Sequence, residues 1–483
     1  MRAPARLGAI VIFCGVSVLA GCTAGPSYTP PTPLTYNNKE HGGFTAAHQE
    51  TALSIAPVPD DWWKLYDDPR LDALIEKAIA ANTDLRAANA NLERSRALLQ
   101  EAKTLREPSV MLNGGVQYGQ TAGEQYLQRV SPPLSWDYET GLTVGYDLDL
   151  FGGIKRGIEA AAADDEAVAA AHDLVVVNVV AGTAQAYSSI CGLGLQLQSA
   201  ERSLDLQRQS LDLTQRLMSG GRATDLDVTR QRQLVSQLEE VIPSLSAAQK
   251  NALFQLAVLT GKPPAEYDAD LMSCVAPPRL LTQLPVEDGA ALLKRRPDIR
   301  KAERFLAAAT AEIGVATAGL YPDIQVGLSG GSIGLTRDIF TAPTNFWDLG
   351  VVLKWQANQS AARAKIAAAE AGTKLALANF DGTVLQALRE AESALNNYVH
   401  DLQKEQSAVT ARDQAAVAVD EARRLQLGGR ISPLNVLDAQ RTLAAADLSL
   451  AQVRTAIAFD QTAIFLALGG GWQQVHTQMA GPR

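Results

Sequence analysis

Apolar residues in the middle of the chain recur at steps of seven. These positions are Leu197, Leu204, Leu211 and Met218. A seven-residue step is the period of helices that pack side by side, as in a coiled coil. The step ends at the pair Gly220-Gly221, so the pattern predicts a long helix followed by a tight reversal.

The same design occurs a second time. Gly428 and Gly429 follow Gly220 and Gly221 at an offset of 208 residues. Residues 154–261 and 360–470 are therefore predicted to form two helical hairpins. The first arm, with roughly 65 residues at ~1.5 Å rise each, would extend on the order of 95 Å, several times the length of an ordinary globular helix.

Four other segments alternate between apolar and small or polar residues, which is the period of β-strands. They cover residues 109–119, 140–151, 323–333 and 346–356. The segments between them, residues 120–137 and 334–345, are predicted to be loops. Each strand has about the 9 to 11 residues that a tilted membrane-spanning strand needs.

The strands and hairpins belong to an internal repeat. Residues 82–86 recur as residues 296–300, and Pro108 recurs as Pro322, in both cases at an offset of 214. Each copy reads helix, strand, strand, long helix, turn, helix. The copies cover residues 61–261 and 289–470, with an irregular proline-rich linker at 262–288 and a tail at 471–483. The predicted fold class is mainly α-helical with a membrane β-barrel.

The number of strands predicts an oligomer. An unpaired backbone group in hydrocarbon costs several kcal/mol, so every strand edge must be paired. Four strands cannot close, because the smallest membrane barrels have about eight. Two chains would give eight strands around an interior filled by side chains, whereas three would give twelve around an open interior. A conducting barrel favours three copies, which would form a homotrimer with a 12-stranded barrel continued by a tunnel of twelve helical arms.

The N-terminus has the features of an exported lipoprotein. Arg2 and Arg6 precede an apolar run that ends in Leu-Ala-Gly-Cys at residues 19–22. This order is typical of a signal peptide, residues 1–21, with a bacterial lipobox. Cys22 would then carry a diacylglycerol and an N-acyl chain, which anchor stably in lipid. Residues 22–60 are predicted to be an extended arm, and Thr23 resembles the sorting residue of outer-membrane lipoproteins in Gram-negative bacteria.

Composition and motifs narrow the possible chemistry. The net charge of −9 disfavours nucleic acid as a partner. The sequence has no HExxH, GxSxG, GxGxxG or P-loop pattern and no metal-ligand spacing, so we expect no enzyme, cofactor or metal. Cys191 and Cys274 could form a disulfide in an oxidising periplasm, or they could remain as two buried free thiols.

Several motifs resemble a known family. Residues 292–303 (LLKRRPDIRKAE), residues 318–322 (AGLYP), the lipobox, the Trp62-Trp63 segment and both Gly-Gly turns resemble the outer-membrane efflux lipoproteins, the NodT and OprM branch of the TolC family. The resemblance covers nearly all of the mature chain. It implies a trimeric exit duct for small molecules such as drugs, with a periplasmic end that can open and close. It also implies two partners, a periplasmic adaptor and an inner-membrane pump of the resistance-nodulation-division type.

The resemblance also assigns roles near the two turns. The adaptor is expected to contact the turns through Gly220, Gly221, Arg222, Thr224, Gly428, Gly429, Arg430 and Ser432. The family's constriction, a ring of acidic residues from three chains, corresponds to Asp227, Asn435 and Asp438, although Asn435 stands where some relatives have aspartate. Alternatively, Asp227 and Asp438 are helix-start charges that the helix dipole favours.

Three other functions stay open at this point. A type I secretion duct and a heavy-metal efflux duct would share the same fold. A purely structural coiled-coil lipoprotein would share the helices but would not conduct ions.

Overall fold

The structure is a computed structural model that describes residues 23–31, 44, 52–120, 133–280, 282–286 and 289–470. The predicted signal peptide, the lipidation residue Cys22, most of the arm and the predicted tail 471–483 lie outside these residues. The chain divides into two compact units. The strand unit comprises Met1–Pro31, Leu92–Val168 and Lys301–Phe380, and the hairpin unit comprises Thr32–Asn91, Ala169–Arg300 and Asp381–Arg483.

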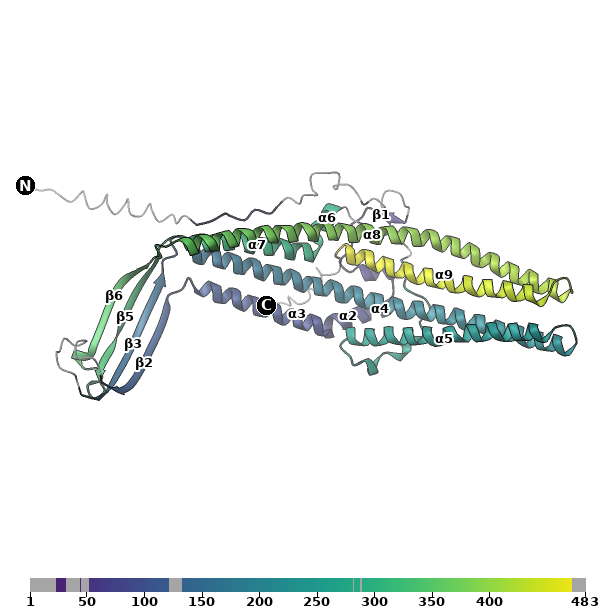
Figure 1. Cartoon of the computed structure of the whole chain (residues 1–483), viewed down its shortest axis with the longest axis horizontal. Helices are drawn as coiled ribbons and strands as arrows, with labels where there is room; N and C mark the ends of the chain where they lie inside the picture. The colour runs from purple at the N-terminus through teal and green to yellow at the C-terminus, as the bar shows by residue number, and fades with distance from the viewer. Residues whose placement is uncertain are drawn as a thin grey trace, which may run out of the picture. The chain divides into compact units, whose positions relative to one another are not determined.

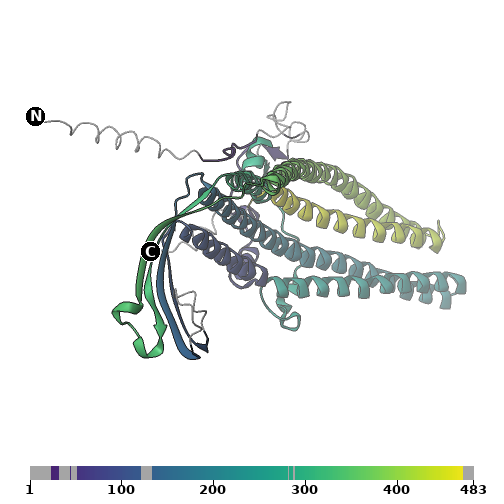
Figure 2. The same cartoon turned by 60° about the vertical axis from the view of Figure 1, so that its left-hand side comes forward.

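The strand unit contains an antiparallel four-stranded sheet in the order β2-β3-β5-β6 (Figures 1 and 2). Its strands are β2 (Ser109–Gly119), β3 (Ser135–Asp147), β5 (Asp323–Leu335) and β6 (Asn345–Lys354). Among the described residues, β2 and β6 each pair with one strand only, so both edges of the sheet are open.

One face of this sheet is apolar across all four strands. Leu112 lies opposite Leu142, Val144 lies opposite Leu328, and Leu328 lies opposite Leu349. Directly opposed residues share a face of a sheet, so these side chains form one band. Leu112 is 79% exposed and Leu349 is 68% exposed. An exposed apolar band of this extent marks a surface that contacts lipid or protein rather than water.

The strand boundaries agree with the sequence pattern to within two residues except at β3. The predicted strand 140–151 is wrong in position, because β3 begins at Ser135 and ends at Asp147. Its start pairs with the end of β2, where Trp136 lies opposite Tyr118, in a region that the sequence suggested was a loop. β3 also ends four residues before the predicted end. Asp149 is not part of the strand, because its carboxylate accepts hydrogen bonds from the backbone amides of Ile154 and Lys155 at the start of the next helix.

The helix expected at the start of the first copy is two helices, α2 (Pro69–Ala81) and α3 (Thr83–Thr104). Asn82 separates them: its side-chain oxygen accepts hydrogen bonds from the amides of Asp84 and Leu85, which is the arrangement of a helix N-cap. The second half has its break at the matching place, since Arg296 separates α6 (Gly289–Arg295) from α7 (Pro297–Ala318).

Two long hairpins follow the strands (Figure 1). The first consists of α4 (Gly153–Ser219) and α5 (Asp225–Leu259), and the second of α8 (Ser360–Leu427) and α9 (Pro433–Ala467). The 67 residues of α4 correspond to about 100 Å at ~1.5 Å per residue. One 18-residue window of α4 is apolar enough to cross a membrane, but 61% of it is buried inside the protein, as in a core helix.

Short elements cover the middle of the hairpin unit. Trp62, in the 3-10 helix η2 (Trp62–Tyr66), is 1% exposed and stacks on Phe465 of α9 with ring centroids 4.6 Å apart. The strand β1 (Leu53–Ser54) pairs in parallel with β4 (Leu284–Pro285). The predicted linker contains η4 (Pro264–Glu266) and η5 (Ala269–Ser273). In the strand unit, the loop before β6 contains two further short helices, η6 (Thr336–Asp338) and η7 (Ala342–Thr344).

Candidate functional site

The two turns between the long helices have the same backbone geometry. At the first, the amide of Arg222 donates to the carbonyl of Leu217 at 2.8 Å, and Gly221 has a φ of 69°. At the second, the amide of Arg430 donates to the carbonyl of Leu425 at 2.9 Å. A hydrogen bond from a backbone amide to the carbonyl five residues earlier ends a helix when the residue before the donor has a left-handed backbone conformation. Glycine adopts this conformation without strain.

The helix that follows the first turn begins with a capping box. The hydroxyl of Thr224 accepts a hydrogen bond from the amide of Asp227, and the Asp227 carboxylate accepts one from the amide of Thr224 at 2.9 Å. The same carboxylate also accepts a hydrogen bond from the Thr224 hydroxyl at 2.7 Å. These hydrogen bonds lower the pKa of Asp227. Its carboxylate is therefore engaged at the helix start, the role that the sequence offered as the alternative to a pore ring.

The second turn lacks this box. Ser432 is exposed and makes no capping hydrogen bond, and Pro433 is the first helical residue. Asn435, which corresponds to Asp227 at the offset of 208, is exposed, as is Asp438. No hydrogen bond between described residues joins Asp227, Asn435 and Asp438, so the pore ring stays a prediction.

A groove of about 160 Å³ lies between the hairpins, within the hairpin unit. Leu206 and Leu238 of the first hairpin and Leu443 of the second contribute apolar walls. Gln440 also lines the groove; its Oε1 accepts a hydrogen bond from Ser210 at 3.1 Å, and its Nε2 is buried without a hydrogen-bond partner among the described residues. The sequence did not indicate this site, because its walls come from four helices far apart in the chain.

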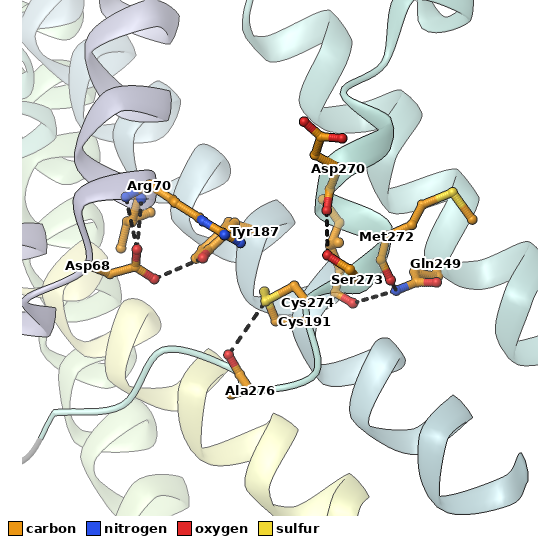
Figure 3. The surroundings of a disulfide bond; sticks show 12 residues. Asp68, Arg70, Tyr187, Cys191, Gln249, Asp270, Met272, Ser273, Cys274 and Ala276 are labelled. Carbon is orange, nitrogen blue, oxygen red and sulfur yellow. Dashed lines mark hydrogen bonds between the residues drawn. A yellow bond between two sulfur atoms is a disulfide. The ribbon is translucent and has the colours of Figure 1, made fainter.

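Cys191 and Cys274 form a disulfide (Figure 3), which the sequence had left open. The bond ties the residue after η5 to the middle of α4. Gln249 of α5 supports the same place, since its Nε2 donates to the carbonyl of Ile190 and to that of Met272, both at 3.2 Å. The segment after the first hairpin is thus held on the helices by covalent and polar contacts.

The described residues contain no group of three or more His, Cys, Asp or Glu side chains placed to hold a metal ion. The expectations of no cofactor and no enzyme activity stay predictions.

The chain is similar to known transport proteins along its length. The model of a family described as outer membrane efflux protein matches residues 74–262 and 290–470. Nodulation protein T of Rhizobium leguminosarum is 28% identical over 95% of this chain and 96% of its own. A pyoverdine export outer membrane protein, OpmQ of Pseudomonas putida, is 30% identical over 92% of this chain and 94% of its own.

Solved structures give the same result. The outer-membrane channel OprN superposes with a TM-score of 0.87 at 31% identity, covering 94% of this chain and all of that one. Family match, relatives and fold agree over both halves of the sequence, and the chain belongs to the outer membrane efflux protein family.

Proposed function

We propose that three copies of the chain form a trimeric exit duct in the outer membrane, through which small molecules leave the periplasm. The observation that carries the proposal is the open four-stranded sheet with its exposed apolar band. An open sheet edge inside hydrocarbon would leave backbone groups unpaired, at several kcal/mol each. Pairing β6 of one copy with β2 of the next would satisfy both edges and close twelve strands.

The two faces of the sheet suit the two sides of such a barrel. The apolar band would face lipid. The opposite face carries polar side chains that alternate with the band along each strand, namely Asn113, Gln117, Glu139, Ser329 and Asp348. A polar interior is what a water-filled channel requires.

The start of the described chain supports the proposed lipid anchor at Cys22. Arg156 of α4 donates hydrogen bonds to the carbonyls of Ala24 and Gly25, at 3.1 and 3.3 Å. Tyr28 donates to Glu303 of α7. These contacts hold residues 24–28 on the helices of the strand unit, the unit that also contains the four strands.

We further propose that the turns at Gly220-Gly221 and Gly428-Gly429 are the periplasmic tip, where an adaptor docks and where the duct closes. Three features support this location. Arg222 and Arg430 are exposed and supply positive charge, and the groove beside Gln440 supplies an apolar wall and an unused hydrogen-bond donor. An inner-membrane pump of the resistance-nodulation-division type would complete the system. The relative named as a pyoverdine exporter supports a small organic compound as cargo.

Two measurements test the proposal. Purified protein should migrate in SDS as a trimer that dissociates on heating, and it should conduct ions in planar bilayers. A monomer without conductance would instead support the structural lipoprotein. Deletion of the gene, followed by a panel of drugs, dyes and metal salts, should then identify the cargo; sensitivity to metals alone would favour the heavy-metal duct, and loss of a secreted protein would favour type I secretion.

A further inference from the structure

The two halves of the chain make equivalent contacts at the level of single hydrogen bonds. Asn82 donates from Nδ2 to the carbonyl of Leu259 at 3.0 Å, and Arg296 donates from Nη1 to the carbonyl of Ala467 at 2.8 Å. Asn82 and Arg296 are 214 residues apart, and Leu259 and Ala467 are 208 apart, which are the two offsets of the internal repeat. The repeat therefore relates contacts as well as sequence.

An ion pair in the hairpin unit joins the two halves. Arg300 of α7, in the second half, pairs with Asp173 of α4, in the first half, at 3.2 Å. The side chain of Asp173 is 2% exposed and that of Arg300 is 40% exposed. The offsets of 214 and 208 map Arg300 onto Arg86 of α3 and Asp173 onto Asp381 of α8. Both counterparts keep the residue type, so the chain holds the same charged pair twice.

The second pair is not formed within one chain. Arg86 is exposed and Asp381 is half-buried, and neither side chain has a hydrogen-bond or ion-pair partner among the described residues. In a closed ring of copies, first halves and second halves alternate. Each first half would therefore contact the second half of the preceding copy in the same way as it contacts the second half of its own chain. The missing partner of Arg86 is then an aspartate at position 381 on another chain.

We infer that Arg86 pairs with Asp381 of the neighbouring copy, and that this pair fixes how the copies register around the ring. The inference rests on the proposed trimer. Asp381 has an apolar neighbour one turn away, Leu385, which is 57% exposed, whereas the matching residue of α4, Val177, is 2% exposed. The face of α8 around Asp381 is thus apolar and uncovered at the place where the matching face of α4 is covered.

The repeat also limits the inference to this pair. A second ion pair between α7 and α4 joins Arg304 to Glu166 at 2.8 Å. Its counterparts are Ala90 and Lys374, which cannot form an ion pair. Of these two ion pairs, only the one between Arg300 and Asp173 has a charged counterpart of both signs.

Charge reversal tests the pair. Arg86→Asp and Asp381→Arg should each lower the temperature at which half of the trimer dissociates in SDS, and the double variant should recover at least half of that loss. Arg86→Lys, which keeps the charge, should stay close to the wild type. Additive losses in the double variant would overturn the inference, because unrelated sites add and contacting charges do not.

Crosslinking tests which chain supplies the partner. The full-length variant Arg86→Cys/Asp381→Cys is treated with a short bismaleimide, since the Cα atoms of an arginine and an aspartate in contact can exceed the reach of a disulfide. Dimer and trimer bands should appear that neither single cysteine variant gives. A crosslink confined to monomers would overturn the inference. If the wild type is itself monomeric in detergent, the proposed duct fails; if it is trimeric but the double cysteine variant gives no ladder, only the Arg86–Asp381 pair fails.

Discussion

Asp460 is an acidic residue whose replacement should stabilise the protein. It lies on α9 near Asp401 of α8, and its Oδ2 is buried without a hydrogen-bond donor among the described residues. Burial raises the pKa of Asp460 to about 7, the negative charge of Asp401 acts in the same direction, and Lys404 opposes them. Lys404 lies 3.7 Å from Asp401, so its charge is shared between two carboxylates.

The size of the effect follows from this pKa. The difference from the ordinary value of 3.8 corresponds to an upper bound of about 4 kcal/mol, at ~1.36 kcal/mol per pH unit. Because Asp460 and Asp401 are only half-buried, solvent screening reduces the cost of ionisation to about 1–2 kcal/mol. A raised pKa means that the native state holds the proton more tightly than the unfolded state. The cost is therefore absent below about pH 4, grows toward pH 7 and is complete above it.

Asp460→Asn removes the ionisable group and keeps the shape. We expect it to raise the unfolding temperature of the protein in detergent by a few °C at pH 8 and by less at pH 5. Asp401→Asn should give a smaller gain, because it removes the repulsion but leaves Asp460 buried, and the double variant should gain less than the sum, because either change alone removes the repulsion. An equal gain at both pH values, or a loss at pH 8, would refute the reasoning.

Three further predictions concern other contacts in the hairpin unit. Glu405 contacts Arg279 at 2.8 Å and Arg454 at 3.1 Å. Burial raises the pKa of Glu405, but these two partners outweigh it and lower the pKa. Glu405→Gln should therefore cost about 1–3 kcal/mol of unfolding free energy at pH 7 and progressively less as the pH falls below 4.5; an equal cost at pH 4 would contradict this. Thr224→Ala should lose the capping box at about 1 kcal/mol, seen as faster hydrogen exchange at the start of α5, whereas the matched change Ser432→Ala should leave α9 unchanged. Cys191→Ser/Cys274→Ser should lose about 2–4 kcal/mol of unfolding free energy, and wild-type protein treated with reductant should match it; two free thiols in unreduced, unfolded wild type would show that the bond is not formed.

The long helices and their turns could be predicted because their signals are local. The seven-residue apolar step lies within one helix, and the Gly-Gly pair lies within one turn. The hairpin predicted to begin at residue 360 begins there, at the first residue of α8. The start of β3 could not be found in this way. Its first residues form a strand because they pair with the end of β2, and pairing partners separated by a loop leave no periodic signal.

The roles of some site residues could not be predicted, because their sequence spacing fits two different roles. The spacing of Thr224 and Asp227 fits both a capping box and an acid beside a pore, and only the distances show that the carboxylate bonds the helix start. The pair of Asp401 and Asp460 was not found at all. Its members lie on different helices of a hairpin, and each alone resembles an ordinary surface aspartate.

The two turns differ in how much of their side-chain chemistry the fold already uses. At the first turn, Thr224 and the Asp227 carboxylate bond one another. At the second, Pro433 begins the helix through its fixed φ, so Ser432 and Asn435 keep their donors and acceptors exposed. A group bonded within a turn must give up that bond before it binds anything else. We therefore expect a docking partner, or a polar ring around a pore, to depend more on Ser432 and Asn435 than on Thr224 and Asp227, the reverse of the order that formal charge suggests.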